Sequence, residues 1–404
     1  MKICMLAYTF YESDNRVMRY AEALARQGHQ VDAVTLLGEG HPKYETMHGV
    51  EVCRIQRRVL DEARPYVYAR KLLTFLCRAA WFLAQRSVKT PYDLVHVHNI
   101  PDFLVFAALI PKLRGAKIIL DIHDLVPEFY ASKFREARHA LTVRFLKRVE
   151  KMSIAFSDFV LIANDIWRER LCGRSVHRDK VLTMLNYPDE TIFSRRPPKS
   201  SNGTFVVIYP GSLSWHQGLD VAIKAFALLR DRLPQAELHI YGDGHEKPKL
   251  RQLVEGLGLQ NHVLFHTILT LRDIKDVIAQ ADLGLVPKRK DSFGDEAFST
   301  KILEFMAIGV PVVASDTTID KLYFDDTKLC FFTSGDPQSL ADSIVKVHDD
   351  VAYREKLLKN AFAYVASNNW GVKQGAYLQL VERLTGKKIF PAEKREILEA
   401  EIEC

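Results

Sequence analysis

The feature that most constrains the fold is an alternation of short apolar runs with longer amphipathic segments. The first series begins with a continuous apolar run at residues 3–8, followed by helical spacing over residues 17–27 that ends at Gly28. An unbroken apolar run is typical of a strand buried on both faces, and glycine commonly ends a helix. Strands separated by helices predict right-handed crossovers and therefore a parallel, doubly wound sheet.

The alternation occurs twice along the chain. Further strands of the first series are expected at residues 31–37, 94–98, 117–122 and 159–163. The second series has expected strands at residues 205–209, 236–241, 263–266, 283–286 and 310–314, and a helix at residues 219–229. Between them, residues 194–203 combine prolines, serines, a glycine and basic side chains, which is typical of a linker.

We therefore predict an α/β protein with two Rossmann-like, doubly wound domains. The domains span residues 1–195 and 196–385, and a charged tail follows at residues 386–404, either as a peripheral helix or disordered. Ligands of such sheets bind beyond the carboxyl ends of the strands, so the two domains are expected to face each other across a ligand-binding cleft.

Composition excludes several other classes of protein. With 48% hydrophobic and 26% charged residues among 404, the chain is neither disordered nor a small disulfide scaffold. No uncharged apolar run approaches the roughly 18 residues of a transmembrane helix, and no signal peptide is indicated at the N-terminus. Six scattered cysteines without a C-x-x-C pair predict reduced thiols and a cytoplasmic location.

Positive charge is concentrated in the first half of the chain. Residues 1–200 contain 32 lysines and arginines against 22 acidic residues, whereas residues 201–404 contain 24 against 28. This asymmetry favours an anionic partner for the first domain, although a solvated basic surface would have the same composition.

The most informative segment is residues 295–314, which reads as a polar loop, a short helix, a stop at Gly309 and a buried strand. Ser299 or Thr300 is expected to cap this helix, whose first N–H groups form an anion site. Lys301 lies in the first turn, where the helix dipole disfavours a cation unless a phosphate is close.

Two glutamates flank this anion site. Glu304 lies about one turn into the helix and could accept two hydrogen bonds from a ribose diol, while Glu296 precedes the helix in the loop. The arrangement suits a sugar–diphosphate–ribose ligand. An ordinary capped helix with one solvated glutamate remains the alternative.

The Glu296 and Glu304 motif, followed by residues 305–314, resembles the signature of retaining glycosyltransferases of family 4 (group 1), which have the GT-B fold. The resemblance covers roughly residues 1–385. Further matching motifs follow in family order: Pro210-Gly211 with Gly218-Leu219, residues 241–244, Asn186 with Asp189 and Phe193, and the histidine-bearing strand ends at residues 93–98 and 121–124.

The resemblance implies transfer of a sugar, with retention, from a nucleotide diphosphate donor to a hydroxyl acceptor. It assigns catalytic roles to His123 and Glu296, which face the donor sugar, and to Lys301 at the diphosphate, while Glu304 holds the ribose. The implied donor-binding set is Gly211, Gly218, Gly242, Asp243, Gly244, Arg289, Phe298, Ser299, Thr300 and Glu304. The implied acceptor-side set is Asn15, Arg16, His98 and Asp124.

The sequence departs from the family pattern in two places. Ser212 and Gln217 occupy positions where many members carry an arginine and a lysine that grip phosphate. The basic run at residues 288–290 could replace them, or it could be a solvated loop. The loop at residues 9–15 also lacks the glycine pair often found there.

No metal or cofactor is expected. The chain has no Asp-x-Asp pair in a suitable loop, and we expect His96 and His98 to face opposite sides of their strand, one packed and one lining the cleft. The nucleotide sugar is then a substrate, and the reaction is metal-independent.

Residues 64–89 have helical periodicity with an apolar face, six basic residues and Trp81, and residues 133–151 extend the basic surface. This is the composition of an interfacial helix, or else of a core helix with a solvated back. We expect Phe75, Trp81 and Phe82 to insert into an anionic membrane, so that the enzyme lies on the inner face of the membrane. The acceptor is then a saccharide, most plausibly lipid-linked, in polysaccharide assembly. Nucleic acid is not expected to bind.

Two other functions remain open at this point. One is a nucleotide-sugar epimerase with the same fold, which would form product without an acceptor. The other is a nucleotide-sugar-binding regulator with weak activity, which the neutral Ser212 and Gln217 favour.

Overall fold

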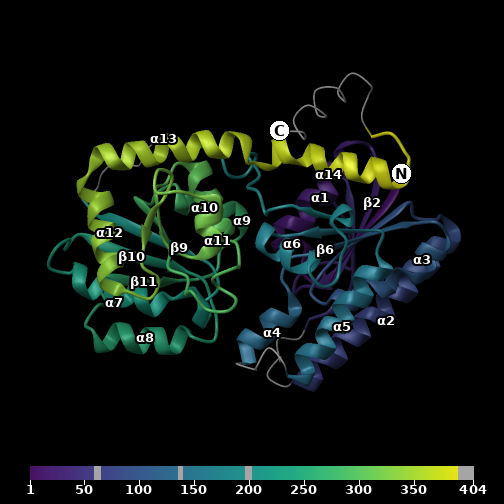
Figure 1. Ribbon diagram of the computed structural model, residues 1–404, viewed down its shortest axis with the longest axis horizontal. Helices are drawn as coiled ribbons and strands as arrows, with labels where there is room; N and C mark the ends of the chain where they lie inside the picture. The colour runs from purple at the N-terminus through teal and green to yellow at the C-terminus, as the bar shows by residue number, and fades with distance from the viewer. Residues whose placement is uncertain (59–64, 135–139, 196–202, 390–404) are drawn as a thin grey trace. The chain divides into compact units, whose positions relative to one another are not determined.

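The computed structural model describes residues 1–58, 65–134, 140–195 and 203–389 (Figure 1). The chain divides into two compact units. Unit 1 comprises Met1–Asn186 together with the chain from Lys373 onward, and unit 2 comprises Tyr187–Val372. The linker at residues 196–202 and the tail from residue 390 lie outside the described residues.

The division differs from the expected one at the C-terminal side. The sequence placed all residues up to 385 in the second domain, but helix α14 (Trp370–Thr385) returns to unit 1 for most of its length. The physical reason is burial, because Tyr377 of α14 is fully buried, packs against Tyr20 and hydrogen-bonds to His96.

Unit 1 contains one eight-stranded sheet in the order β3-β4-β2-β1-β5-β6-β7-β8. Its strands are β1 (Lys2–Ala7), β2 (Gln30–Leu37), β3 (Tyr44–Met47), β4 (Val50–Arg57), β5 (Leu94–His98), β6 (Lys117–Ile122), β7 (Phe159–Ile162) and β8 (Val181–Thr183). All neighbours pair in parallel except β3 and β4, which form an antiparallel edge.

The helices of unit 1 cover this sheet (Figure 1). Besides α14 they are α1 (Asn15–Arg26), α2 (Pro65–Lys89), α3 (Leu109–Leu113), α4 (Val126–Phe134), α5 (Leu141–Phe156) and α6 (Asp165–Cys172), with the 3-10 turns η1 (Tyr11–Ser13), η2 (Asp102–Ala108) and η3 (Arg178–Lys180). Helix α1 begins where the Asp14 side chain accepts a hydrogen bond from the Val17 backbone N–H. Helices α2 and α5 both pack against η2.

Unit 2 contains a six-stranded sheet in the order β11-β10-β9-β12-β13-β14, and every pair is parallel. Its strands are β9 (Phe205–Pro210), β10 (Ala236–Tyr241), β11 (Val263–His266), β12 (Leu283–Val286), β13 (Val312–Ser315) and β14 (Cys330–Phe332). Its helices are η4 (Trp215–Gln217), α7 (Leu219–Leu229), α8 (Lys247–Gly256), α9 (Leu271–Ile278), α10 (Thr300–Ile308), α11 (Thr318–Tyr323), α12 (Pro337–Asp349) and α13 (Val351–Ser367).

Two hydrophobic cores lie on opposite faces of this second sheet. Val207 and Tyr209 of β9 pack into the core that α7 and α12 complete, while Ile208 packs into the core that α10 and α13 complete. Side chains that alternate between faces are expected of a strand covered on both sides. The expectation of two parallel α/β domains is therefore confirmed.

The strand order locates the two places where ligands are expected. In unit 1, β1 lies between β2 and β5, and in unit 2, β9 lies between β10 and β12. The connections leave in opposite directions at these points, so a crevice opens at the carboxyl ends of β1 and β5 and of β9 and β12. Among the described residues, no helix combines the length and apolar character needed to cross a bilayer.

Candidate active site

The predicted glycines after β9 and β10 let two loops touch backbone to backbone. A Cβ on Gly242 would lie 1.8 Å from the carbonyl oxygen of Gly211, and one on Gly244 would lie 2.4 Å from that of Leu213. The Asp243 carboxylate accepts the Gly244 N–H at 2.8 Å, which closes the turn. Side chains are excluded at these glycines, so the loops at the carboxyl ends of β9 and β10 form one compact wall.

A third glycine positions the arginine of the expected basic run. Gly218 has a φ of 69°, and a Cβ there would lie 1.9 Å from the carbonyl oxygen of Pro287. Next to this contact, Arg289 pairs with Asp220 at 2.5 Å and lies 4.7 Å from the centroid of the Trp215 ring. Asp220 therefore neutralises much of the charge that Arg289 could offer to a phosphate.

The first turn of α10 has an uncapped N-terminus. Ser299 occupies the cap position before Thr300, but its side chain makes no capping hydrogen bond, so the expected cap is not formed. Its hydroxyl, in a residue only 5% exposed, finds no hydrogen-bond partner among the described residues. The first N–H groups of a helix lack intrahelical acceptors, so this end of α10 is suited to an external anion.

Lys301 brings a cation to the same turn. Its ammonium group lies 5.3 Å from the Tyr209 ring centroid and packs against Gly211. Burial lowers the pKa of Lys301 to about 8, while the negative charge of Glu304 opposes this shift. A phosphate at the helix start would raise this pKa again and hold the lysine in its charged form.

The two positions that lack the family's basic residues belong to a neutral hydrogen-bonded group. The Tyr209 hydroxyl lies 2.9 Å from the Ser212 carbonyl oxygen and 3.0 Å from Gln217 Oε1. Tyr209 is fully buried. The loop after β9 is therefore held by a tyrosine where an arginine and a lysine would otherwise approach the ligand.

Lys288 neither replaces these missing cations nor lies in a solvated loop, the two alternatives that the sequence left open for residues 288–290. Lys288 is only 3% exposed, donates to the Ala297 carbonyl oxygen at 2.7 Å and pairs with Asp320 at 2.9 Å. The neighbouring Lys290 donates to the Asp316 carbonyl oxygen at 3.3 Å. Lys288 therefore anchors the loop that precedes α10.

This loop carries Glu296 in a fixed frame. Asp295 accepts hydrogen bonds from both the backbone N–H and the hydroxyl of Thr318, each at 2.8 Å. On the other side of Glu296, Phe298 packs edge-to-face on Tyr323 with ring centroids 5.2 Å apart. Glu296 is half-buried between these two anchors, and Glu304 is half-buried in the helix that follows.

In unit 1, a pocket of about 190 Å³ lies at the carboxyl ends of β1 and β5. It is lined by Ala7, Tyr8, Thr9, Asp14, Arg58, Tyr68, His98, Asn99 and Ile100. Of the expected acceptor-side residues, His98 lines this pocket, Asn15 follows Asp14 as the first residue of α1, and Asp124 offers its carbonyl oxygen to Asn99 at 2.8 Å. Burial raises the pKa of the Asp124 carboxyl.

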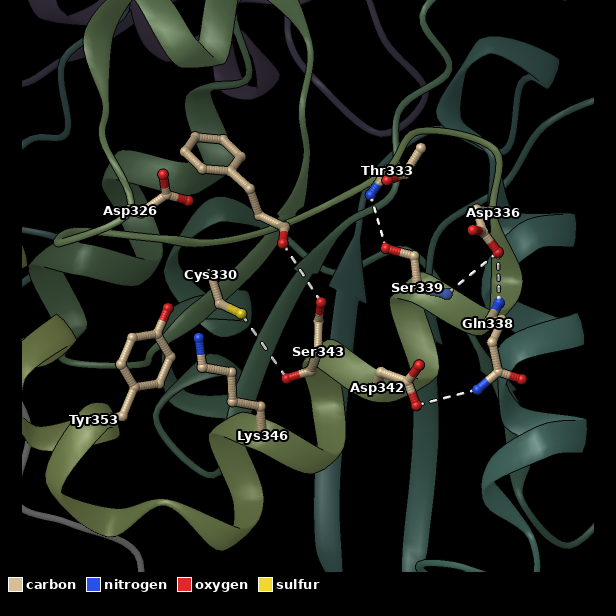
Figure 2. Close-up of a pocket in the computed structure, with 11 residues that line it drawn as sticks. Asp326, Cys330, Thr333, Asp336, Gln338, Ser339, Asp342, Ser343, Lys346 and Tyr353 are labelled. Carbon is tan, nitrogen blue, oxygen red and sulfur yellow. Dashed lines mark hydrogen bonds between the residues drawn. The ribbon is translucent and has the colours of Figure 1, made fainter.

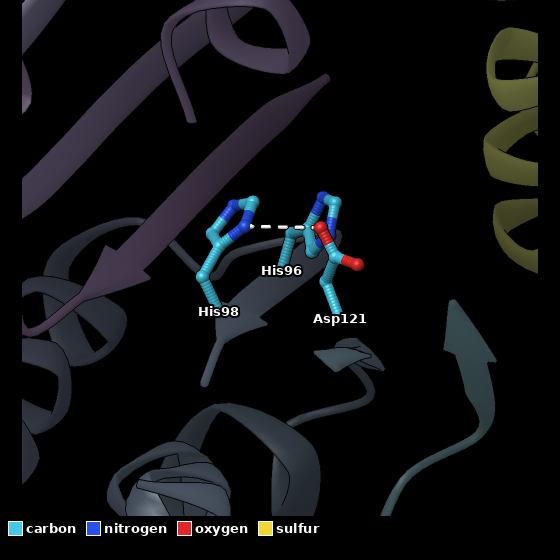
Figure 3. A group of neighbouring side chains, drawn as sticks. All are labelled: His96, His98 and Asp121. Atoms are coloured by element: carbon cyan, nitrogen blue, oxygen red, sulfur yellow. Dashed lines mark ion pairs between the residues drawn. The ribbon is translucent and has the colours of Figure 1, made fainter. Parts of the chain in front are cut away.

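The sequence predicted that His96 and His98 face opposite sides of β5, but the two side chains lie on the same side. Their rings stack with centroids 4.2 Å apart, and His98 Nδ1 lies 3.2 Å from Asp121 Oδ2 (Figure 3). The expectation was wrong because side chains alternate with a period of two, so residues two apart share a face.

These three side chains lie close enough together to hold one metal ion. However, Arg16 donates to both carboxylate oxygens of Asp121 at 2.7 Å, and an ion at Asp121 would have to displace this guanidinium. The donor set therefore fits a divalent metal poorly, and metal independence stays a prediction.

His123 lies beside this cluster, with Nε2 3.2 Å from Asp121 Oδ2 and its backbone N–H bound to Asn99 Oδ1 at 2.7 Å. Arg16, expected on the acceptor side, is only 4% exposed and reaches His123 through Asp121. The sequence motifs did not predict a role for Asp121, although an acidic residue inside an otherwise apolar strand is a signal that could have identified it.

A second groove, of about 610 Å³, lies on unit 2 beside α12 (Figure 2). It is lined by Asp326, Cys330, Phe331, Thr333, Asp336, Gln338, Ser339, Asp342, Ser343, Lys346 and Tyr353, none of which belongs to the predicted site. Its polar groups mostly bind one another: Asp336 caps α12, and Ser339 accepts from the Thr333 N–H at 2.9 Å. We therefore place the candidate site at the loops after β9, β10 and β12 and at the start of α10.

Comparison with known proteins identifies the family of both units. Residues 190–364 match the family model "Glycosyl transferases group 1", and residues 13–186 match the "Glycosyl transferase 4-like domain" model. An uncharacterized glycosyltransferase of Methanocaldococcus jannaschii is 26% identical over 361 residues, covering 84% of this chain and 86% of the relative.

Two further comparisons concern named proteins. The putative colanic acid biosynthesis glycosyltransferase WcaL of Escherichia coli is 30% identical over 159 residues, which cover 39% of each chain. The crystal structure of HepE from Anabaena in complex with UDP-glucose has a TM-score of 0.70 at 19% identity, covering 96% of this chain and all of that chain. The structural likeness shows the GT-B fold, and the two family models, one on each unit, show that the chain belongs to the group 1 glycosyltransferases.

Proposed function

We propose that the protein transfers a sugar from a nucleotide diphosphate donor to a hydroxyl acceptor with retention of anomeric configuration. The observation that carries the proposal is the start of α10, where uncapped N–H groups, a buried serine hydroxyl and Lys301 converge. This combination suits a diphosphate, which gains negative charge as the glycosidic bond breaks.

The flanking carboxylates complete the donor site in this proposal. Glu304 holds the ribose diol and Glu296 binds hydroxyl groups of the donor sugar, as the family resemblance implies. The glycine-packed loops of Gly211, Gly218 and Gly242 bring backbone groups to the same sheet edge. Support for a nucleotide sugar also comes from HepE, whose structure was solved with UDP-glucose.

The donor is identified by a stability screen followed by an assay of the product. UDP, GDP and ADP are tested for a rise in melting temperature, because a ligand that binds only the folded state stabilises it by mass action. The matching nucleotide sugars are then assayed for transfer, and proton NMR reports the anomeric configuration of the product. An inverted product contradicts retention, and conversion without an acceptor indicates an epimerase.

The proposed reaction needs no metal, since Lys301 and helix N–H groups supply the positive charge at the diphosphate. Dialysis against EDTA should leave the transfer rate unchanged. Loss of activity that Mg²⁺ or Mn²⁺ restores would contradict this part of the proposal.

For the acceptor we propose a lipid-linked saccharide in polysaccharide assembly, bound at the pocket of unit 1. The similarity to WcaL supports a role in polysaccharide assembly. The second support is an exposed surface of apolar and basic side chains on α2 and α5, two helices that both pack against η2.

This outer surface differs from the one that the sequence predicted. Phe75 is fully buried against Tyr8 and cannot insert into a bilayer, whereas Trp81 is 68% exposed. Three of the expected basic residues, Arg64, Arg135 and Arg138, lie outside the described residues. The exposed apolar members are Leu73, Trp81 and Val88 on α2 and Leu141, Phe145 and Met152 on α5, and the exposed basic members are Arg70, Arg78, Lys89, Arg144, Arg148 and Lys151.

Such a surface suits an anionic bilayer, because apolar side chains insert while each nearby lysine or arginine adds about 1 kcal/mol. Co-sedimentation with vesicles that contain anionic lipid measures the binding of the protein to such a bilayer. The double variants Trp81→Ala/Phe145→Ala and Arg78→Glu/Arg148→Glu should each reduce binding at least tenfold. The matched control Ile268→Ala removes an exposed apolar side chain of unit 2. Equal binding by all variants, or none by the wild type, contradicts the proposal.

A further inference from the structure

Asp121 is held rigidly beside His123, the histidine that the family resemblance places at the donor sugar of the proposed reaction. Arg16 grips it with two parallel hydrogen bonds, from Nε to Oδ2 and from Nη2 to Oδ1, each 2.7 Å long. A third hydrogen bond of 2.7 Å ties Arg16 Nη1 to the Met184 carbonyl oxygen. Such a bidentate pair fixes the carboxylate plane as well as its charge.

One oxygen of this carboxylate serves two imidazoles. Asp121 Oδ2 lies 3.2 Å from His123 Nε2 and 3.2 Å from His98 Nδ1, and these two nitrogens are themselves 3.2 Å apart. If one nitrogen instead accepted a hydrogen bond from the other, its lone pair would point at the carboxylate 3.2 Å away, so the anion favours a hydrogen on both His123 Nε2 and His98 Nδ1.

The charges in the cluster favour neutral His96 and His98 beside an ionised Asp121 carboxylate. Burial lowers the pKa of both His96 and His98, although Asp121 opposes the shift. Burial disfavours ionisation of Asp121, but Arg16 and His123 hold its pKa well below the usual range. Arg16 and Asp121 already balance each other, so an additional buried proton would be uncompensated.

We infer that Asp121, clamped by Arg16, holds His123 in the tautomer that carries its hydrogen on Nε2. Nδ1 then keeps its lone pair and accepts a hydrogen bond from a substrate hydroxyl. His123 orients that hydroxyl and donates no proton to the leaving group. Asp121 and Arg16 are positioning residues in this account, which rests on the proposed role of His123 toward the sugar.

The tautomer is measured directly on the full-length protein with ¹⁵N-labelled histidine. Long-range ¹H–¹⁵N correlation spectra distinguish the two neutral tautomers, and the His123→Gln variant assigns the signal of His123. We expect a single Nε2–H form in the wild type without any ligand. A mixture of tautomers, or the Nδ1–H form, would overturn the inference even if glycosyl transfer is confirmed.

Variants then connect the tautomer with the rate. Asp121→Asn should populate the other tautomer and lower kcat about tenfold or more, with little change in KM for the nucleotide sugar. Arg16→Lys keeps the positive charge but loses the pair of hydrogen bonds to Asp121. This variant should therefore also populate the other tautomer and lower kcat, but less than Asp121→Asn does. The matched control is Asp179→Asn, which changes an exposed carboxylate 2.7 Å from His177 and should leave both readouts unchanged.

The two amide replacements of His123 separate the roles of its nitrogens. Asn presents its amide oxygen near the position of Nδ1, whereas Gln reaches the position of Nε2. His123→Asn should therefore keep at least tenfold more activity than His123→Gln. The reverse order would show that Nε2 makes the functional contact and would overturn the inference.

Discussion

At the scale of single residues, the protonation state of Lys301 depends on whether a diphosphate is bound. It packs against Gly211 and Tyr209, and burial lowers its pKa to about 8, so it is still protonated at neutral pH. A diphosphate at the start of α10 would hold the proton, because an anion favours the charged form. The same lysine can therefore lose its charge in the free enzyme and keep it in the complex.

We predict that kcat/KM falls as the pH rises through about 8, because that ratio reports ionisations of the free enzyme. Lys301→Arg should move this alkaline limb upward by at least one pH unit, since a guanidinium stays protonated. The pH dependence of kcat/KM between pH 6 and 10 measures the effect. An alkaline limb that stays in place in the variant would contradict the assignment.

The stability of the protein should respond to the same ionisation with a defined sign. The folded-state pKa of about 8 lies below the reference value of 10.5, so the unfolded chain binds more protons between these values. Stability relative to the Lys301→Met variant should therefore rise with pH from about 8 to 10.5 and stay flat below 8. Urea unfolding at a series of pH values measures this difference.

The two glutamates should separate nucleotide binding from transfer. Glu304→Ala should weaken binding of the free nucleotide by about 1.5–3 kcal/mol, because a charged hydrogen bond to the ribose is lost. Glu296→Ala should leave this affinity nearly unchanged but lower kcat strongly, because its partner is the sugar. Calorimetry with UDP or GDP measures nucleotide affinity, and transfer assays measure kcat. Equal losses of nucleotide affinity in both variants would contradict the separate assignment of Glu304 to the ribose and Glu296 to the sugar.

The residue types at the site were predictable from spacing in one motif, but their partners were not. Lys288 pairs with Asp320 and Arg16 pairs with Asp121, and each partner lies far along the chain. A local pattern cannot reveal such a pairing, so the sequence left open whether the basic run at residues 288–290 binds phosphate or is solvated. The stacking of His96 on His98, in contrast, follows from the period of a strand and was predictable.

At the scale of elements, burial decided which strands the sequence revealed. Central strands such as β1, β5 and β12 are buried along their whole length, and β1 from Ile3 onward and β12 form continuous apolar runs. Of the strands that the sequence did not predict, β3, β8 and β14 are short and lie at sheet edges, whereas β4 lies between β3 and β2 and contains Glu51, Arg54 and Gln56. An edge strand has one neighbour only, so its sequence is under weaker constraint.

The loops after β9 and β10 can pack together only because Gly242 has no Cβ atom. Gly242→Ala would place a Cβ 1.8 Å from the Gly211 carbonyl oxygen, so the loops must separate. We expect a loss of about 1–3 kcal/mol in stability, the usual cost of overpacking, together with weaker nucleotide binding. Thermal unfolding and calorimetry report these two effects.

Gly256→Ala is the matched control for this prediction. Gly256 is the last residue of α8, and an added Cβ would meet nothing within 4 Å. Alanine is the better helix former, so stability should stay the same or rise by about 0.5–1 kcal/mol. A similar loss in both variants would contradict the importance of the contact with Gly211.

At the scale of the whole molecule, the chain builds unit 1 from two separated segments. Helix α14 follows all of unit 2 in sequence, yet Tyr377 packs at 4.3 Å on Tyr20 and its hydroxyl lies 2.9 Å from His96 Nδ1. The sequence could not show this, because the apolar spacing of α14 fits either unit. Only tertiary contacts place it beside β5 and α1.

We predict that Tyr377→Ala destabilises unit 1 by about 3–5 kcal/mol, as expected when a large buried aromatic side chain is removed. Hydrogen exchange should rise in α1 and β5 but not in β9 and β10 of unit 2. Gln379→Ala, two residues away and partly exposed, serves as the control. Uniformly faster exchange in both units would contradict the division of the chain.

The return of α14 has a consequence for recombination. In topological terms, unit 2 is a domain inserted between the two chain segments that form unit 1. Tyr187–Val372 is therefore the segment that can be exchanged as a block. A chimaera spliced once, near residue 190, would import a foreign last helix and lose the hydrogen bond between Tyr377 and His96. Donor specificity should therefore be transplanted between relatives with two crossover points, leaving each host its own α14.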